Sequence, residues 1–240
     1  VGRDPIEILK YTNPGPGTTF SLAITHLKGA RPRFLKYIYT GKGVTVDEYA
    51  TDSSTIYGHP NAVGAQAIGA AFYVHTPAFG VVPPLLEPFS STGPTPILFD
   101  RAGSPITQHR LKPELVAPDG ANTTFFGQDI PDPGDGSDAD DLPNFFGTSA
   151  SAAHAAAVAA LILSANPALS PTEIRQALEQ TAIDMGPSGF DHDSGYGLLQ
   201  ALPALTQAIQ HDVVNTQTSS PITALPGQPI AYRISFTNQG

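Results

Sequence analysis

The chain contains no cysteine among its 240 residues. It therefore forms no disulfide, uses no thiol nucleophile and builds no zinc–thiolate site. Basic residues are also scarce, because 12 lysines and arginines stand against 21 acidic residues, which gives a formal net charge of −9. Binding to nucleic acid without sequence preference needs a basic surface, so the composition excludes this class of partner.

Long apolar runs are missing as well. No stretch of 18 apolar residues occurs, and the most apolar segment, residues 150–165, is too short to cross a bilayer. The sequence therefore predicts no membrane span. The chain begins at Val1 without a signal-peptide pattern, and both ends read as the interior of a longer sequence. We expect an excerpt of a larger protein.

What the chain does contain is a turn followed by an alanine-rich, uncharged segment at residues 145–163. Alanine and leucine favour helix, and the absence of a polar face predicts a helix buried on every side. Gly147 permits a sharp bend just before it. Ser149 would then lie where free backbone N–H groups and the helix dipole stabilise an oxyanion. The alternative is that Thr148 or Ser149 is an ordinary N-cap.

Residues 147–154 read GTSASAAH. This string resembles the serine motif of the subtilisin-like serine proteases, the subtilases, which is written G-T-S-x-[AS]-x-P-H. Ala153 replaces the usual proline, whose role in the motif is structural. Ser151 stands where G-x-S-x-G would need its last glycine, which disfavours an esterase of the α/β-hydrolase type.

Other segments resemble subtilase landmarks and follow one another in family order between residues 55 and 206. They are AIGA at 67–70, EPFSSTGP at 87–94, KPELVAPDG at 112–120 and GYGLLQA at 195–201. Asp119 is inserted in the third of them, before Gly120. The resemblance implies a three-layer α/β/α fold with a mainly parallel sheet, represented here by the C-terminal half of the catalytic domain.

The resemblance also implies a mechanism, in which a serine attacks the scissile carbonyl, a histidine takes its proton and an aspartate orients the histidine. Ser149 matches the nucleophile, and its own backbone N–H would donate to the oxyanion. Neither D-[ST]-G nor H-G-T occurs before Ser149. We therefore expect the catalytic Asp, the His and the oxyanion Asn upstream of these residues, and the fragment alone to be inactive.

Four residues inside the chain are weaker candidates for these roles. His59 lacks the Gly-Thr that follows the catalytic histidine in the family, and its alternative role is structural. Asn61 is a candidate oxyanion amide, although the family's Asn lies further upstream. Asp193 begins a D-S-G string but comes after Ser149, in the wrong order. His154 lies five residues after Ser149 and so not on the same helix face.

Residues 127–141 form an acidic segment interrupted by Pro and Gly, which predicts a solvated loop. Its six acids are Asp129, Asp132, Asp135, Asp138, Asp140 and Asp141. Carboxylates on a loop suit Ca²⁺, which takes six to eight oxygens. The spacing does not fit D-x-[DN]-x-[DN]-G, so a plain acidic loop is favoured over calcium. No cofactor is required.

Composition and pattern divide the chain into four parts. Alternating strands predict a β-rich segment at 1–45, and the family resemblance suggests that it is the end of a module inserted in the catalytic domain. Residues 46–206 are the C-terminal part of that domain, with a surface hairpin near 96–103. A capped helix is predicted after Ser170, with Pro171 at its first position. Residues 207–220 read as a linker, and 221–240 as the first strand of an Ig-like β-sandwich repeat, with further repeats expected downstream.

These observations predict a serine endopeptidase of the subtilisin type that hydrolyses peptide or protein substrates. The family resemblance further implies an extracellular or cell-surface location. The alternative is a non-catalytic subtilase-like or peptide-binding module, and an esterase ranks last.

Overall fold

The structure of the chain is a computed structural model, which describes residues 8–31, 35–39, 44–51, 53–124, 126–131, 138–210, 213–220 and 231–238. The chain divides into two units, Val1–Thr45 and Val46–Gly240.

The centre of the second unit is a pair of parallel strands, β1 (Ile68–Phe72) and β4 (Leu115–Asp119), in the register Ile68↔Leu115 through Phe72↔Asp119. Both strands are almost wholly buried, as their apolar sequences predict. The segment around Leu198 extends the pair through a parallel bridge to Val116.

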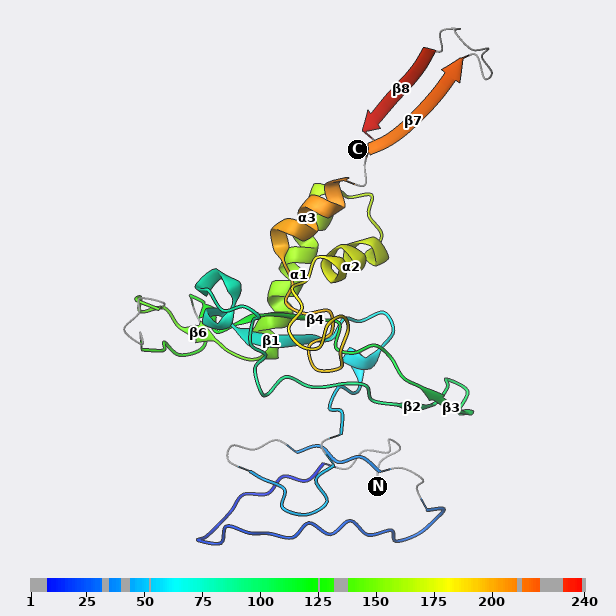
Figure 1. Cartoon of the computed structure of the whole chain (residues 1–240). Coiled ribbons are helices and arrows are strands. Elements are labelled where there is room, and N and C mark those ends of the chain that lie inside the picture. The colour runs from blue at the N-terminus through cyan, green and yellow to red at the C-terminus, as the bar shows by residue number, and fades with distance from the viewer. Residues whose placement is uncertain are drawn as a thin grey trace. The chain divides into compact units, whose positions relative to one another are not determined.

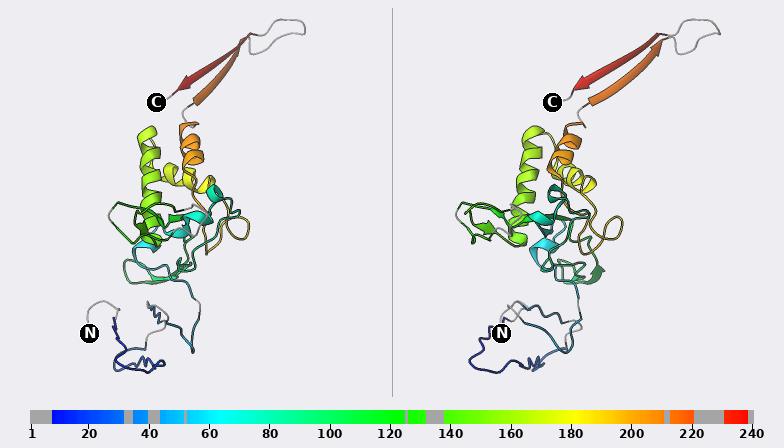
Figure 2. Two further views of the ribbon diagram at one scale, coloured as in Figure 1. Left: turned by 90° about the vertical axis from the view of Figure 1, so that its left-hand side faces the viewer. Right: turned by 60° about the vertical axis from the view of Figure 1, so that its left-hand side comes forward.

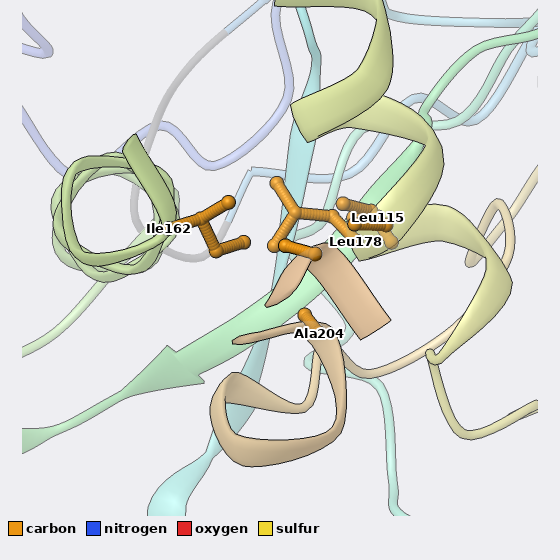
Figure 3. Close-up of a cluster of buried hydrophobic side chains, with 6 residues drawn as sticks. Leu115, Ile162, Leu178 and Ala204 are labelled. Atoms are coloured by element: carbon orange, nitrogen blue, oxygen red, sulfur yellow. The ribbon is translucent and has the colours of Figure 1, made fainter. Parts of the chain in front are cut away.

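Three helices pack on one face of this pair. They are α1 (Thr148–Ala165), α2 (Pro171–Gln180) and α3 (Ala201–Gln210). Helix α1 packs on both strands, and Figures 1 and 2 show α2 and α3 beside it. Ile162, Leu178 and Ala204, one from each helix, converge with Leu115 of β4 in the core cluster of Figure 3.

The other face of the strands carries Ala71 and Val116, which pack against Leu198, Leu86 and Ile183. In the described part of the chain, irregular segments and not helices cover this face. The parallel strands and their helices confirm the predicted α/β fold.

The prediction that α1 is buried all round is wrong. Ala150, Ser151, Ala155 and Ile162 form its buried stripe, whereas Leu161 is 58% exposed. An uncharged composition permits burial on every side but does not supply the neighbours for it. Among the described residues, α1 is also the one helix that could cross a membrane by length and composition. That is weak evidence, because the core helix of a soluble protein meets the same criteria.

Shorter elements surround the central pair. The predicted surface hairpin is formed by β2 (Ile97–Phe99) and β3 (Pro105–Gln108), and a second antiparallel pair by β5 (Ala121–Asn122) and β6 (Asn144–Phe145). Three 3₁₀ turns complete the unit: η1 (His59–Asn61), η2 (Tyr73–His75) and η3 (Pro77–Phe79).

The described residues of the first unit contain no strand, so the predicted β-structure at 18–25 is not formed; the predicted strand at 33–40 lies partly outside the described residues. Phe20, Leu22 and Ile24, the apolar face of that pattern, are all at least half exposed. Tyr11 and Phe20 contact each other with ring centroids 4.9 Å apart. An alternating pattern becomes a strand when a partner covers its apolar face, and the described residues supply none.

The C-terminal residues also differ from the prediction. Helix α3 runs to Gln210, past the expected boundary at 206, and β7 (Val213–Ser220) occupies most of the predicted linker. The expected strand is present as β8 (Ala231–Asn238), which pairs antiparallel with β7. The polar residues of β7 read as a linker because they lack an apolar alternation. The assignment of these strands to a sandwich repeat stays a prediction.

Candidate active site

Ser149 is the second residue of α1 and its side chain is exposed. The chain leaves β6, turns at Gly147 with φ 104°, and enters the helix at Thr148. A positive φ of this size suits glycine, which explains why the motif begins with one. Gly147 is the N-cap and no side chain caps the helix. The alternative reading of Thr148 or Ser149 as the N-cap is therefore wrong.

The backbone N–H of Ser149 belongs to the first turn of α1. The first four N–H groups of a helix precede its first i→i−4 hydrogen bond, so they point out of the helix end. The residues of this first turn are not themselves acidic. A carbonyl oxygen that gains negative charge beside Ser149 would meet these donors.

A cavity of about 640 Å³ opens beside Ser149. Ser149, Thr148 and Ala152 of α1 form one wall, and residues 55–60 and 66–68 form much of the remainder. The walls combine apolar side chains such as Ile56 and Ile68 with a few polar groups. Pockets of this size and mixed character are typical of ligand sites.

His59 and Ser149 line this same cavity. His59 is the first residue of η1 and is exposed. Across the described residues, no hydrogen bond joins the His59 ring to Ser149. The structure thus brings the two residues to one cavity without forming the contact that a general base needs.

Asn61 is committed elsewhere. Its side chain is buried, and Nδ2 donates to the Thr95 carbonyl at 3.1 Å. The Asn61 carbonyl accepts a hydrogen bond from Arg110. An oxyanion donor needs a free N–H, so this geometry does not favour Asn61 for that role.

His154 and Asp193 serve other contacts. Nδ1 of His154 lies 3.0 Å from the Pro118 carbonyl, which ties α1 to β4. Asp193 is exposed in a turn, where its N–H donates to Asp191 Oδ1 at 2.7 Å. Neither residue lines the cavity beside Ser149.

Two residues near the site were given no functional role from the sequence. Gln66 lines the cavity, and its buried Nε2 has no acceptor among the described residues. Asp119 accepts a hydrogen bond at Oδ2 from the N–H of Gly147 at 2.7 Å. The sequence signal for Asp119 was its insertion into the A-P-G string, whereas an isolated glutamine carries no comparable signal.

The acidic segment is described in part, since Asp132 and Asp135 lie outside the described residues. Asp138 is 3% exposed, and its Oδ2 accepts from Asn144 Nδ2 at 2.9 Å. Desolvation and the charges of Asp138, Asp141 and Asp140 raise the pKa of Asp129. No group of three or more metal-ligating side chains forms in the described segments. Calcium binding here stays a prediction.

Comparison with known proteins gives the family. The sequence profile of the Subtilase family matches residues 45–197. The chain is 46% identical over 59 residues to fervidolysin of Fervidobacterium pennivorans, which covers 25% of this chain and 8% of that protein. It is 46% identical over 67 residues to the halolysin-like extracellular serine protease Nep of Natrialba magadii, covering 28% and 12%.

A plant relative extends the aligned region. The chain is 30% identical over 146 residues to the CO(2)-response secreted protease of Arabidopsis thaliana, covering 55% of this chain and 18% of that protein. The crystal structure of fervidolysin, a keratinolytic enzyme related to subtilisin, matches with a TM-score of 0.41 and 22% identity over 73% of this chain and 26% of that chain.

The chain therefore spans between 8% and 18% of the length of these curated relatives. The profile match, in contrast, covers well over half of the 240 residues. By this match the chain belongs to the subtilase family.

Proposed function

We propose that this chain carries the nucleophile of a serine endopeptidase of the subtilisin type. Ser149 attacks the scissile carbonyl of a peptide or protein substrate. The observation that carries the proposal is the position of Ser149, exposed at the uncapped N-terminus of α1 and at the edge of a cavity of about 640 Å³. Family membership makes this chemistry the natural use of that geometry.

The first step forms a bond between Ser149 Oγ and the carbonyl carbon while a histidine removes the hydroxyl proton. The carbonyl oxygen becomes an oxyanion, and the Ser149 N–H donates to it. The tetrahedral intermediate then collapses, the peptide nitrogen leaves with the proton from the histidine, and an acyl-enzyme remains. Water then attacks the acyl carbon while the histidine removes a proton from the water, and Ser149 Oγ leaves that carbon and takes the proton from the histidine.

The base for this reaction comes from outside the described residues. His59 lines the same cavity but forms no hydrogen bond with Ser149. No other histidine of the described residues lines this cavity. We propose that the Asp, the His and the oxyanion Asn belong to a part of the protein that precedes this chain in sequence. The chain by itself then hydrolyses no peptide.

Labelling with a fluorophosphonate probe tests the nucleophile. We expect the full-length protein to be labelled on Ser149, and Ser149→Ala to abolish labelling. Ser164→Ala is the matched control, because Ser164 is an exposed serine on the same helix. Equal labelling of wild type and Ser149→Ala would reject the assignment.

A second comparison tests the source of the base. His59→Ala in the full-length protein should label at the wild-type rate. Turnover of a peptide by the 240-residue chain alone, lost on His59→Ala, would show that His59 is the base after all.

The competing proposal is a non-catalytic subtilase-like module that binds peptides in the same cavity. It predicts a folded full-length protein that is not labelled but still binds peptide, with affinity lowered by a bulky substitution such as Ala152→Phe on the cavity wall. An unlabelled wild type that retains peptide binding would favour this module over the protease.

We further propose that the protein acts outside the cell or at its surface. Two relatives are named extracellular or secreted proteases. Detection of the protein in the culture medium or on intact cells tests this location, and its confinement to the cytosolic fraction would contradict it.

A further inference from the structure

Asp119 is buried directly beneath the start of the serine helix. It is the last residue of β4 and has no exposed surface. Its Oδ2 accepts a hydrogen bond from the N–H of Gly147, with 2.7 Å between oxygen and nitrogen. Gly147 is the N-cap of α1 and lies two residues before Ser149. A carboxylate from a distant strand thus holds the turn that no side chain of the helix itself caps.

The backbone next to Asp119 is closely packed. Gly120 follows with φ 73°, and a Cβ at this position would lie 2.6 Å from the Phe72 ring and 2.8 Å from the Phe146 ring. The N–H of Gly120 donates to the Phe145 carbonyl at 2.8 Å. The carboxylate of Asp119 is therefore presented to Gly147 from a closely packed turn.

The contacts between residues 119–122 and residues 144–147 form a series that ends next to Ser149. The pair β5–β6 comes first, the bond from Gly120 to Phe145 comes next, and the bond from Gly147 to Asp119 comes last. Beyond it the chain passes into the first turn of α1. The last bond is thus the one that lies nearest to the peptide units leading to Ser149.

The Asp119 side chain is buried, and only one of its two oxygens has a hydrogen-bond partner among the described residues. Its Oδ1 is buried and has no partner among the described residues. Burial raises the pKa of Asp119, while the N–H of Gly147, its own N–H and the nearby His154 ring act in the opposite direction. The other acidic group facing it is Glu87, whose pKa is raised by burial and then by the charge of Asp119.

A desolvated carboxylate with one unpartnered oxygen costs free energy, and an amide could accept the same hydrogen bond. What the carboxylate adds is a shorter and stronger bond to a backbone N–H at the positive end of a helix. Such a bond fixes the geometry of the turn at Gly147, and the burial of the carboxylate lowers the stability of the fold.

We infer that Asp119 is a positioning residue for the reaction: its carboxylate holds the N–H of Gly147 and thereby fixes the turn from which Ser149 projects. This inference rests on the proposed role of Ser149. Displacement of a nucleophile by about 1 Å costs up to a hundredfold in rate. Loss of the acceptor should therefore lower kcat and leave KM nearly unchanged.

Substitutions at Asp119 in the full-length protein test the inference. We expect Asp119→Ala to lower kcat and the rate of fluorophosphonate labelling by about tenfold or more, with KM within about twofold of wild type. Asp119→Asn keeps an acceptor and should recover most of the loss. Asp191→Ala is the matched control, because Asp191 accepts backbone N–H bonds in a turn away from the cavity.

A second readout does not depend on catalysis. The Gly147 amide proton should resonate downfield in the NMR spectrum of the wild type and should move as Asp119 titrates, whereas Asp119→Asn should remove that movement. If wild type is unlabelled but the Gly147 signal titrates, the proposed function fails and the contact stands.

Three results would overturn the inference. They are an Asp119→Ala protein that folds with unchanged kcat, a change in KM alone, or equal losses in Asp119→Ala and Asp119→Asn. If Asp119→Ala does not fold, Asp119→Glu replaces it, since it keeps the charge but moves the carboxylate by one methylene. In that case the inference requires Asp119→Glu to lower kcat and Asp119→Asn to keep most of it. The opposite order rejects the inference.

Discussion

Lys112 Nζ lies 2.5 Å from Glu114 Oε1, and both side chains are buried in the segment that immediately precedes β4. Lys112 also donates to the Ala65 carbonyl at 2.5 Å, and Glu114 Oε2 accepts from the Ala67 N–H at 2.7 Å. The ion pair therefore fastens the entry of β1 to that of β4 and holds the segment that carries Gln66.

Breaking this pair should destabilise the protein strongly. Lys112→Met leaves the Glu114 charge buried without its cation, and such losses cost about 3–5 kcal/mol. Arg175→Met is the control, because the Arg175–Glu179 pair is 3.7 Å apart and partly exposed. It should cost about 1 kcal/mol or less. Urea unfolding measures both, and similar losses would contradict the structural role of the buried pair.

The start of α2 offers a local test. Ser170 Oγ accepts from the Glu173 N–H, and Glu173 Oε2 accepts from the Ser170 N–H, which together form a capping box. Ser170→Ala should lower the free energy of unfolding by about 1 kcal/mol. Thr172→Ala, at an exposed position in the same turn, should change it far less. If the two variants unfold at the same denaturant concentration, the cap is not stabilising.

Substitution of two glycines with positive φ distinguishes the cost of backbone strain from the cost of steric crowding. Gly197 has φ 104°, and a Cβ there would lie 2.0 Å from the Ile183 carbonyl oxygen. Gly189 has φ 91°, and nothing lies within 4 Å of the same position. Gly189→Ala should cost about 1–2 kcal/mol from the backbone conformation. Gly197→Ala should cost at least about 2 kcal/mol more, because a backbone contact must open. Thermal unfolding of the two variants checks this difference.

Gln66 tests the cavity beside Ser149. Its Nε2 is buried without an acceptor among the described residues, so Gln66→Leu should be neutral or slightly stabilising when no ligand is bound. If peptides accept a hydrogen bond from this amide, kcat/KM for a peptide should fall about fivefold, since a net hydrogen bond is worth about 1 kcal/mol. Labelling by a small fluorophosphonate should not change. Gln176→Leu, an exposed glutamine of α2, controls for the added apolar surface.

The burial of Asp119 predicts a pH dependence of stability. Because its pKa is raised in the folded protein, the protonated form is favoured there. The stability that protonated Asp119 contributes to the folded protein is complete below the ordinary pKa of 3.8. It is lost as the pH rises through the raised pKa of the folded state. Asp119→Asn should therefore gain stability relative to wild type as the pH increases from about 4 to 7. A constant difference across this range would contradict the raised pKa.

Local signals in the sequence were sufficient where the structure depends on neighbours in the chain. The capping box at Ser170 and Glu173 and the break before α1 at Gly147 both follow from short stretches of residues. Their physical basis is backbone conformation and hydrogen bonds within a few positions, which need no partner from elsewhere.

The same reasoning failed where burial or pairing depends on distant segments. The alternation at Phe20, Leu22 and Ile24 predicted a strand, but no described segment covers that face. The uncharged helix α1 suggested complete burial, yet Leu161 faces solvent. Residues 213–220 looked like a linker because their pairing with β8 is not visible from their own composition.

The sequence by itself identified the family and the nucleophile that we propose, because the string around Ser149 contains a local turn, a helix start and the serine of the family motif. The tertiary structure decided which groups surround that hydroxyl. It placed His59 and Gln66 along one cavity with Ser149, and Asp119 beneath Gly147. These relationships join residues about 30 to 90 positions apart, and only the packing of β1, β4 and α1 brings them within reach of one another.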